Sequence, residues 1–159
     1  MPPTIVGLVS DTHGLLRPET LAALRGARLI VHAGDIGAPE VLDALARLAP
    51  VVAVRGNNDT GPWARRLPAR ATRTIGRCTI LVVHDRKELR GDPPAGVDVV
   101  VSGHCHRPAV ARAGAVLFVN PGSAGPRRFS LPVTVARLYP DVTPEAEIIA
   151  LRVPPGRRR

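Results

Sequence analysis

Two histidines one residue apart, His104 and His106, follow an apolar run over residues 97–101. Such a run is typical of a buried strand, and two imidazoles just past its end can reach one point above a sheet. Cys105 lies between them and should face the other way, because side chains alternate along extended chain. Imidazole nitrogens are common ligands of transition metals. Paired histidines also occur in ordinary turns, so this motif is weak by itself.

Four other apolar runs also end at side chains that can bind a metal. The first run is followed by Asp11 and His13, the second by Asp35, the third by Asn57, Asn58 and Asp59, and the fourth by His84. Five separated strand ends with such groups predict one metal site, assembled from loops at one edge of a sheet.

The elements that position these groups alternate along the first part of the chain. Strands are expected at residues 4–10, 29–33 and 51–55, with helices at 18–24 and 39–48. This alternation is typical of right-handed βαβ units and a largely parallel sheet, in which ligands bind at the carboxyl ends of the strands. His32 lies inside the second strand, so we interpret it as a packed histidine behind the site and not as a ligand.

The second half of the chain predicts hairpins and strands in an α/β fold. Hairpins are expected over 71–83 and 109–119, and strands at 97–101, 131–138 and 146–153. We expect one domain over residues 1–153, with a basic tail at 154–159. The chain of 159 residues is long enough to bury a core, and it shows no internal repeat.

The composition limits the classes of function. No apolar run approaches the roughly 20 residues of a membrane span, and the N-terminus lacks a secretory pattern. The two cysteines make no disulfide framework. We therefore expect a cytoplasmic protein with no membrane partner.

The chain is strongly basic, with a net charge of +9, and all of its basic residues except Lys87 are arginine. One interpretation is a compositional bias, since glutamine is absent and the arginines are scattered. The other is attraction of anionic substrates. A nucleic-acid binder would need a recognisable motif and interleaved aromatic residues, and neither is present. Specific binding of nucleic acid is therefore not expected.

The ordered set of motifs resembles a known family. Asp-x-His, Gly-Asp, Gly-Asn-x-Asp, a lone His, Gly-His-x-His and Asn-Pro-Gly-Ser occur here in the order found in calcineurin-like metallophosphoesterases. The set looks closest to their small one-domain bacterial and archaeal phosphodiesterases, a branch that includes the retromer scaffold subunit. The resemblance covers residues 6–128. It implies a four-layer α/β/β/α sandwich with two mixed sheets.

The resemblance also implies a dinuclear metal site. One ion would be held by Asp11, His13, Asp35 and His106, and the other by Asp35, Asn57, His84 and His104. Asp35 would therefore bridge the two. Mixed nitrogen and oxygen ligands suit Mn, Fe, Zn, Ni or Co, and the family favours Mn. The implied activity is hydrolysis of small phosphodiesters by a hydroxide that bridges the metals.

Further site residues follow from the same resemblance. Asp35, Asn57 and His104 are implied to be catalytic, and the supporting or substrate-contacting residues are His32, Asn58, Asp59, Asn120 and Ser123. Asn58 stands where related nucleases have a histidine that can protonate the leaving group, and Asn58 cannot do this. Asp59 fits a role in orienting a neighbour. Asp85 follows His84 where the family usually has glycine, which would alter the loop or repel an anionic substrate.

Two classes of function remain open from the sequence. The first is a phosphodiesterase, favoured because all seven ligand positions carry competent side chains. The alternative is a catalytically weak metal-binding scaffold or protein-interaction module with the same fold. A homodimer or a higher homo-oligomer is left open.

Overall fold

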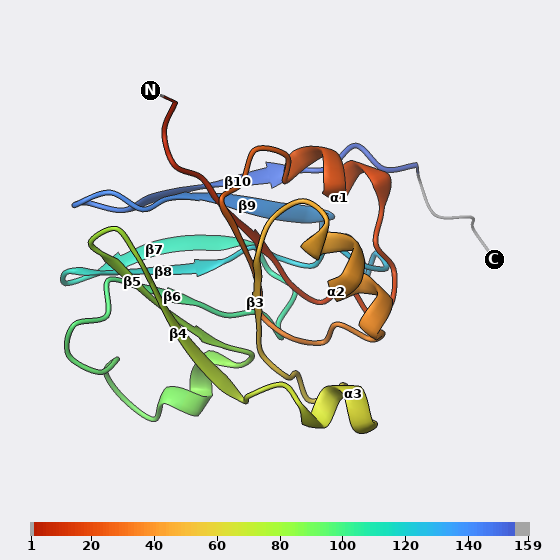
Figure 1. The fold of residues 1–159 in the computed structure, drawn as a ribbon, viewed down its shortest axis with the longest axis horizontal. Coiled ribbons are helices and arrows are strands. Elements are labelled where there is room, and N and C mark those ends of the chain that lie inside the picture. Colours follow the sequence, from red (N-terminus) through yellow and green to blue (C-terminus); the bar gives the residue numbers. More distant parts are fainter. Residues whose placement is uncertain (1, 155–159) are drawn as a thin grey trace.

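Two five-stranded sheets form the centre of the computed structural model, which describes residues 2–154 (Figure 1). The first sheet has the strand order β10-β9-β1-β2-β3, and the second has the order β4-β5-β6-β8-β7. Each sheet mixes parallel and antiparallel pairs. The predicted α/β fold with two mixed sheets is therefore confirmed. Residues 155–159 of the expected basic tail lie outside the described residues.

The first sheet contains the predicted βαβ units. Its strands are β1 (Val6–Val9), β2 (Leu29–His32), β3 (Val51–Ala53), β9 (Thr134–Tyr139) and β10 (Glu145–Ala150). Strands β1, β2 and β3 are parallel, as predicted. The helices are α1 (Pro18–Ala23), α2 (Pro39–Ala46) and the short α3 (Pro62–Arg65). Each helix begins with a proline, whose fixed φ suits the first helical position. The sequence analysis did not predict α3.

The second sheet contains both predicted hairpins. Its strands are β4 (Arg70–Ile75), β5 (Cys78–Val83), β6 (Val99–Val101), β7 (Ala109–Ala113) and β8 (Val116–Asn120). Strands β4 and β5 form one antiparallel pair, and β7 and β8 form the other. Strands β5, β6 and β8 are parallel, so their carboxyl ends point to the same edge. A short 3₁₀ helix, η1 (Arg86–Leu89), follows β5.

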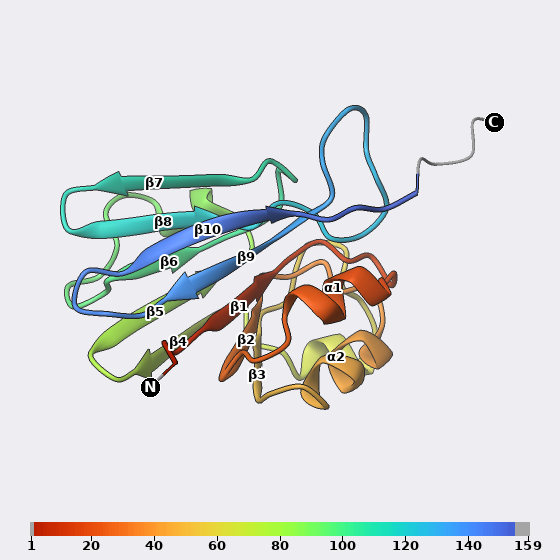
Figure 2. The same ribbon diagram turned by 90° about the horizontal axis from the view of Figure 1, so that it is seen from above.

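Alternation of side chains along the strands separates the core into layers. Val6 and Leu8 of β1 pack between the sheets, whereas Val9 faces the other way toward the helices. Figure 2 shows α1 and α2 together on the outer side of the first sheet. On the outer side of the second sheet, Leu89 of η1 packs near Phe118 in a small cluster. The four layers are therefore the helices α1 and α2, the first sheet, the second sheet, and η1 with its connecting loop.

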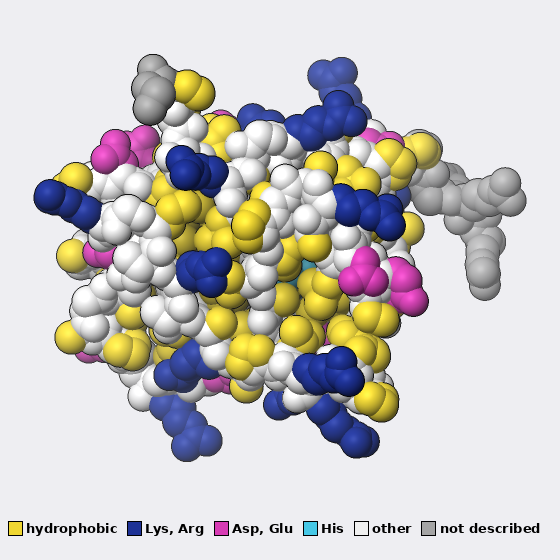
Figure 3. Space-filling view, in the orientation of Figure 1, with side chains coloured by type: hydrophobic (Ala, Val, Ile, Leu, Met, Phe, Trp, Pro, Cys, Tyr) yellow, Lys and Arg dark blue, Asp and Glu magenta, His cyan; other side chains and the backbone are white. Residues whose placement is uncertain are grey.

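The basic side chains do not gather over one element on the face shown in Figure 3. Lys and Arg side chains are spaced around this face, with apolar and neutral atoms between them. This distribution supports the compositional interpretation of the charge for this face. Among residues 2–154, no helix combines the length and apolar composition needed to cross a membrane.

Candidate metal centre

Loops from both sheets meet at one edge of the molecule. In the first sheet, Val9 lies beside His32 and His32 beside Ala53, so the loops after β1, β2 and β3 begin at the same level. Hydrogen bonds join the loops of the second sheet to this edge, since His84 Nδ1 lies 2.7 Å from the Ala33 carbonyl oxygen and the His104 N–H donates to Asp11 Oδ2 at 3.1 Å. The predicted assembly of site residues from separate strand ends is present in the structure.

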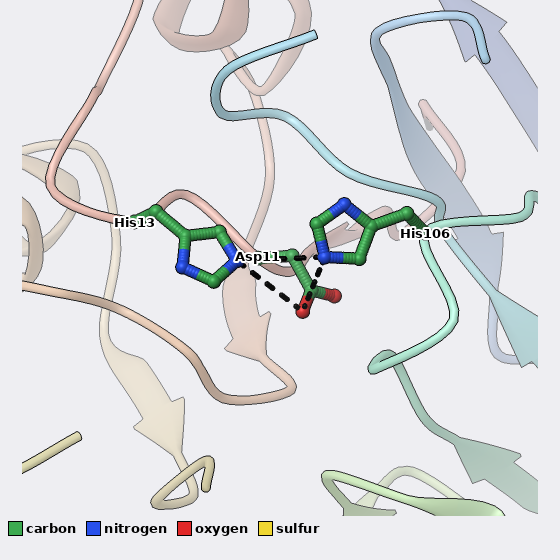
Figure 4. Close-up of side chains that lie close together, drawn as sticks. All are labelled: Asp11, His13 and His106. Atoms are coloured by element: carbon green, nitrogen blue, oxygen red, sulfur yellow. Dashed lines mark hydrogen bonds and ion pairs between the residues drawn. The ribbon is translucent and has the colours of Figure 1, made fainter. Parts of the chain in front are cut away.

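A first cluster contains Asp11, His13 and His106 (Figure 4). The Nε2 atoms of the two histidines are 3.4 Å apart. Asp11 Oδ1 lies 3.4 Å from His106 Nε2 and 3.9 Å from His13 Nε2. Within the described residues this buried oxygen has no hydrogen-bond partner. Two imidazole nitrogens and an orphaned carboxylate oxygen that converge in this way fit a divalent transition metal.

A second cluster contains Asp35, His84 and Asp11, and it shares Asp11 with the first cluster. Asp35 Oδ2 lies 3.8 Å from His13 Nε2 and 3.4 Å from His84 Nε2. Asn57 Oδ1 lies 2.9 Å from His84 Nε2 and 3.1 Å from His104 Nδ1. Asp35 therefore stands between two groups of donors, as a bridging ligand would.

The backbone at this edge is strained. Asp11, His13, Asp35, His104 and His106 all have positive φ angles, between 46° and 71°. Only two other non-glycine residues in the described chain share this property. Left-handed backbone at such residues costs about 1–3 kcal/mol each and persists where the surroundings impose it, often at functional sites.

The sequence and the fold agree on a family. The model of the calcineurin-like phosphoesterase superfamily domain matches residues 5–142. This chain belongs to the calcineurin-like phosphoesterase superfamily. A protein of Methanothermobacter thermautotrophicus named as a probable metallophosphoesterase is 32% identical to it over 163 residues, which cover 94% of each chain.

Solved structures share the fold of this calcineurin-like domain. One is described as a novel archaeal phosphodiesterase, with a TM-score of 0.78, 22% identity, and coverage of 93% of this chain and 100% of that one. Another is vacuolar protein sorting 29 from Cryptosporidium parvum, with a TM-score of 0.75, 20% identity, and coverage of 94% and 92%. The resemblance inferred from the ordered motifs is confirmed.

Hydrogen bonds hold the central carboxylate and imidazole of this phosphoesterase domain as a pair. Burial alone would raise the pKa of Asp35, but hydrogen bonds from His84 and Asn58 keep it well below its usual value. Burial would lower the pKa of His84, but Asp35 and the Ala33 carbonyl raise it to about 9. His84 Nδ1 lies 2.7 Å from the Ala33 carbonyl oxygen and donates to it, which leaves Nε2 to face Asp35.

Asn58 contacts the central carboxylate, and the resemblance had implied only a general supporting or substrate-contacting role for it. Its backbone N–H and its side-chain amide donate to Asp35 Oδ1 and Oδ2, both at 2.9 Å. Asn58 cannot supply an acidic proton, and in the structure it orients Asp35. Its position next to Asn57 in the Gly-Asn-x-Asp turn was the only signal available in the sequence.

Asp59 orients two loops, in agreement with the expectation from the sequence. Its buried carboxylate accepts the Gly37 N–H at 2.9 Å and the Gly56 N–H at 2.8 Å. These bonds join the loop after β2 to the loop after β3. Asp59 therefore fixes the distance between the loops that carry Asp35 and Asn57.

His32 lies behind the metal centre and is packed, as predicted. Its Nδ1 accepts the Gly34 N–H at 3.2 Å, so its Nε2 donates to Thr12 Oγ1 at 2.9 Å. Thr12 Oγ1 in turn donates to the Ile36 carbonyl at 2.8 Å. Complete burial lowers the pKa of His32 to about 3, so this ring is neutral and acts as a hydrogen-bonded spacer.

Asn120 and Ser123 support the loops of the first cluster. The Asn120 amide donates to the Gly103 carbonyl at 3.0 Å and to Cys105 Sγ at 3.3 Å. The Ser123 hydroxyl donates to the Asp11 carbonyl at 3.0 Å. Gly103 itself is required, because an added Cβ would collide with the Ser10 hydroxyl.

Asp85 stands where the family pattern has glycine, and its side chain lies beside His104. Its Oδ2 is 3.7 Å from His104 Nε2, and its Oδ1 accepts the Lys87 N–H at 3.0 Å. Asp85 thereby caps η1. A 3₁₀ helix therefore starts directly at the edge of the candidate metal centre.

Replacing Asp59 with alanine should destabilise the domain by roughly 2–3 kcal/mol, because two N–H groups lose their charged acceptor. Urea unfolding of the variant and of Asp43→Ala, an exposed position on α2, measures this difference. The Asp43 variant should stay within about 0.5 kcal/mol of the parent. Equal stabilities of the two variants would show that Asp59 does not hold the loops.

Proposed function

We propose that this protein is a phosphodiesterase that depends on two divalent metal ions. The observation that carries the proposal is the position of Asp35, whose Oδ2 stands between His13 and His84. A carboxylate between two sets of donors matches a two-metal site. A single metal ion would use only one of the two sets of donors beside Asp35.

The residues divide into two ligand sets around Asp35. The first would comprise Asp11, His13, Asp35 and His106, and the second Asp35, Asn57, His84 and His104. Mixed nitrogen and oxygen donors suit Mn, Fe, Zn, Ni and Co, and the family resemblance favours Mn among them. When bound, the two ions supply the positive charge that neutralises phosphate oxygens and activates water for attack on phosphorus.

The protein's own contribution is to aim its carboxylates. Asp11 Oδ2 accepts the Ser10 hydroxyl at 2.7 Å and the His104 N–H at 3.1 Å, which leaves Oδ1 directed at the first cluster. Asn58 fixes both oxygens of Asp35 in the same way. Such outer contacts orient ligands before they bind, and their loss typically costs 10–100-fold in metal affinity or activity.

The relatives support the reaction class. The similar archaeal protein is named as a probable metallophosphoesterase, and one solved structure with this fold is described as a phosphodiesterase. The structure of vacuolar protein sorting 29 shares the fold as well, and this likeness supports the alternative of a catalytically weak scaffold. The complete donor set of this chain favours the enzyme.

Chelation should abolish hydrolysis of bis(4-nitrophenyl) phosphate, and added Mn²⁺ should restore it. The physical reason is that the site contains two carboxylates, so bound ions are needed to hold a phosphate there and to activate the attacking water. Rates are measured after EDTA treatment and dialysis, and then during titration with Mn²⁺, Ni²⁺, Zn²⁺ and Mg²⁺. Full activity in a demetallated sample would overturn the mechanism, and no activity with any ion would favour the scaffold.

A further inference from the structure

A pocket of about 540 Å³ opens beside the metal centre, on the outer side of the second sheet. Three segments form its walls: the chain that enters η1, the turn that carries the two histidines, and the ends of β7 and β8. His104 belongs both to this wall and to the second ligand set, since its Nδ1 is 3.1 Å from Asn57 Oδ1. The pocket therefore adjoins the candidate metal centre at His104.

The floor of the pocket is apolar and contains one aromatic ring. Ala109 and Ala111 of β7 leave room above the sheet, and Phe118 of β8 lies next to them. The Arg86 guanidinium lies 3.8 Å from the centroid of the Phe118 ring. Stacking in this way fixes the guanidinium plane and leaves its N–H groups at the edge for an anion.

Uncompensated positive charge surrounds this floor. Arg86, Lys87 and Arg107 line the pocket, and within residues 2–154 none of the three side chains has an ion-pair partner. The one carboxylate in the wall, Asp85, is directed toward His104 and the Lys87 N–H. The pocket thus attracts an anion that is separate from a phosphate at the metals.

We propose that this pocket binds one ester arm of the substrate, a planar organic group that carries a second phosphate. The planar part lies against the alanines and the guanidinium plane, and the second phosphate contacts the cations of the rim. The inference rests on the proposed function, because it places the scissile phosphate at the metal centre. It narrows the substrate class to phosphodiesters with a doubly charged, planar arm.

The probe is adenosine 3′,5′-bisphosphate, used as an inhibitor of bis(4-nitrophenyl) phosphate hydrolysis by the Mn²⁺-loaded protein. AMP lacks the second phosphate, and glycerol 1,3-bisphosphate lacks the planar group. Because hydrogen bonds to charged groups contribute roughly 1.5–3 kcal/mol, the bisphosphate should inhibit at least about tenfold more tightly than either. Calorimetric titration with the bisphosphate measures the same binding without turnover.

Two variants test the location of the binding site. Arg86→Ala should reduce the preference for the bisphosphate over AMP by about tenfold. Ala111→Trp should fill the pocket and weaken both adenosine ligands more than glycerol bisphosphate, since the indole occupies the space of the planar group. Arg77→Ala lies in the turn between β4 and β5, outside the pocket lining, and should change none of these values.

The outcomes separate the two proposals. If the diester is hydrolysed but the bisphosphate binds no better than AMP, or if both pocket variants behave like Arg77→Ala, the pocket is not the site of a substrate arm. If no diester is hydrolysed with any metal, the proposed function fails, and calorimetry on the same variants then decides whether the pocket still binds the ligand. Binding that is lost in Ala111→Trp supports the pocket, and unchanged binding overturns it.

Discussion

Asp35→Asn should lose most of its bound metal and hydrolyse bis(4-nitrophenyl) phosphate roughly a thousandfold more slowly. Outer contacts of metal ligands alone are typically worth 10–100-fold, and Asp35 would contact both ions directly. The substitution removes the negative charge from the centre of the two clusters and replaces one oxygen by an amide nitrogen, which is no ligand.

The informative comparison is with His106→Ala, which removes one donor from the first cluster only. The Asp35 variant should bind fewer metal ions per chain than the His106 variant, as measured by elemental analysis of the purified proteins. Asp43→Asn, an exposed aspartate on α2, is the matched control and should retain the full metal content. Equal metal content in the Asp35 and His106 variants would contradict a bridging carboxylate.

The second large effect concerns the leaving group. General acid assistance is typically worth about 10²–10⁴-fold, and mainly for poor leaving groups. Asn58 stands where related nucleases have histidine, and its amide, which donates to Asp35, does not titrate and cannot transfer a proton to an alkoxide. Nitrophenyl diesters should therefore be cleaved readily and DNA very slowly, as measured by parallel initial rates.

Asn58→His sharpens this test. The variant loses the hydrogen bond to Asp35 Oδ2, so its rate with the nitrophenyl ester should fall. Its rate with DNA relative to the nitrophenyl ester should nevertheless rise, provided that the imidazole reaches the leaving oxygen. Rapid DNA cleavage by the parent protein would point to another acid. His32 is excluded from that role by its complete burial and by a pKa of about 3, so Asp85 would be the next candidate.

Local patterns were sufficient to locate the strands and the candidate metal-ligating residues. Asp11, Asp35 and His84 each come one or a few residues after an apolar run, and a buried strand is recognisable from such a run without knowledge of its neighbours. Parallel order then brings the strand ends to one edge. The sequence therefore determined the fold class, the edge of the sheets at which the candidate site lies, and the family.

Only the tertiary structure decided how the side chains at that edge meet. Asn58 contacts Asp35 across 23 positions of sequence, and His104 donates its N–H to Asp11 across 93. The positive φ angles at the candidate ligand positions depend on bonds between loops, such as that from the His13 N–H to the Asp35 carbonyl. The pocket likewise needs η1, β7 and Phe118 of β8 to meet, although they are separate in the chain. Apolar periodicity encodes burial, whereas the direction of a loop side chain is set by partners distant in the chain.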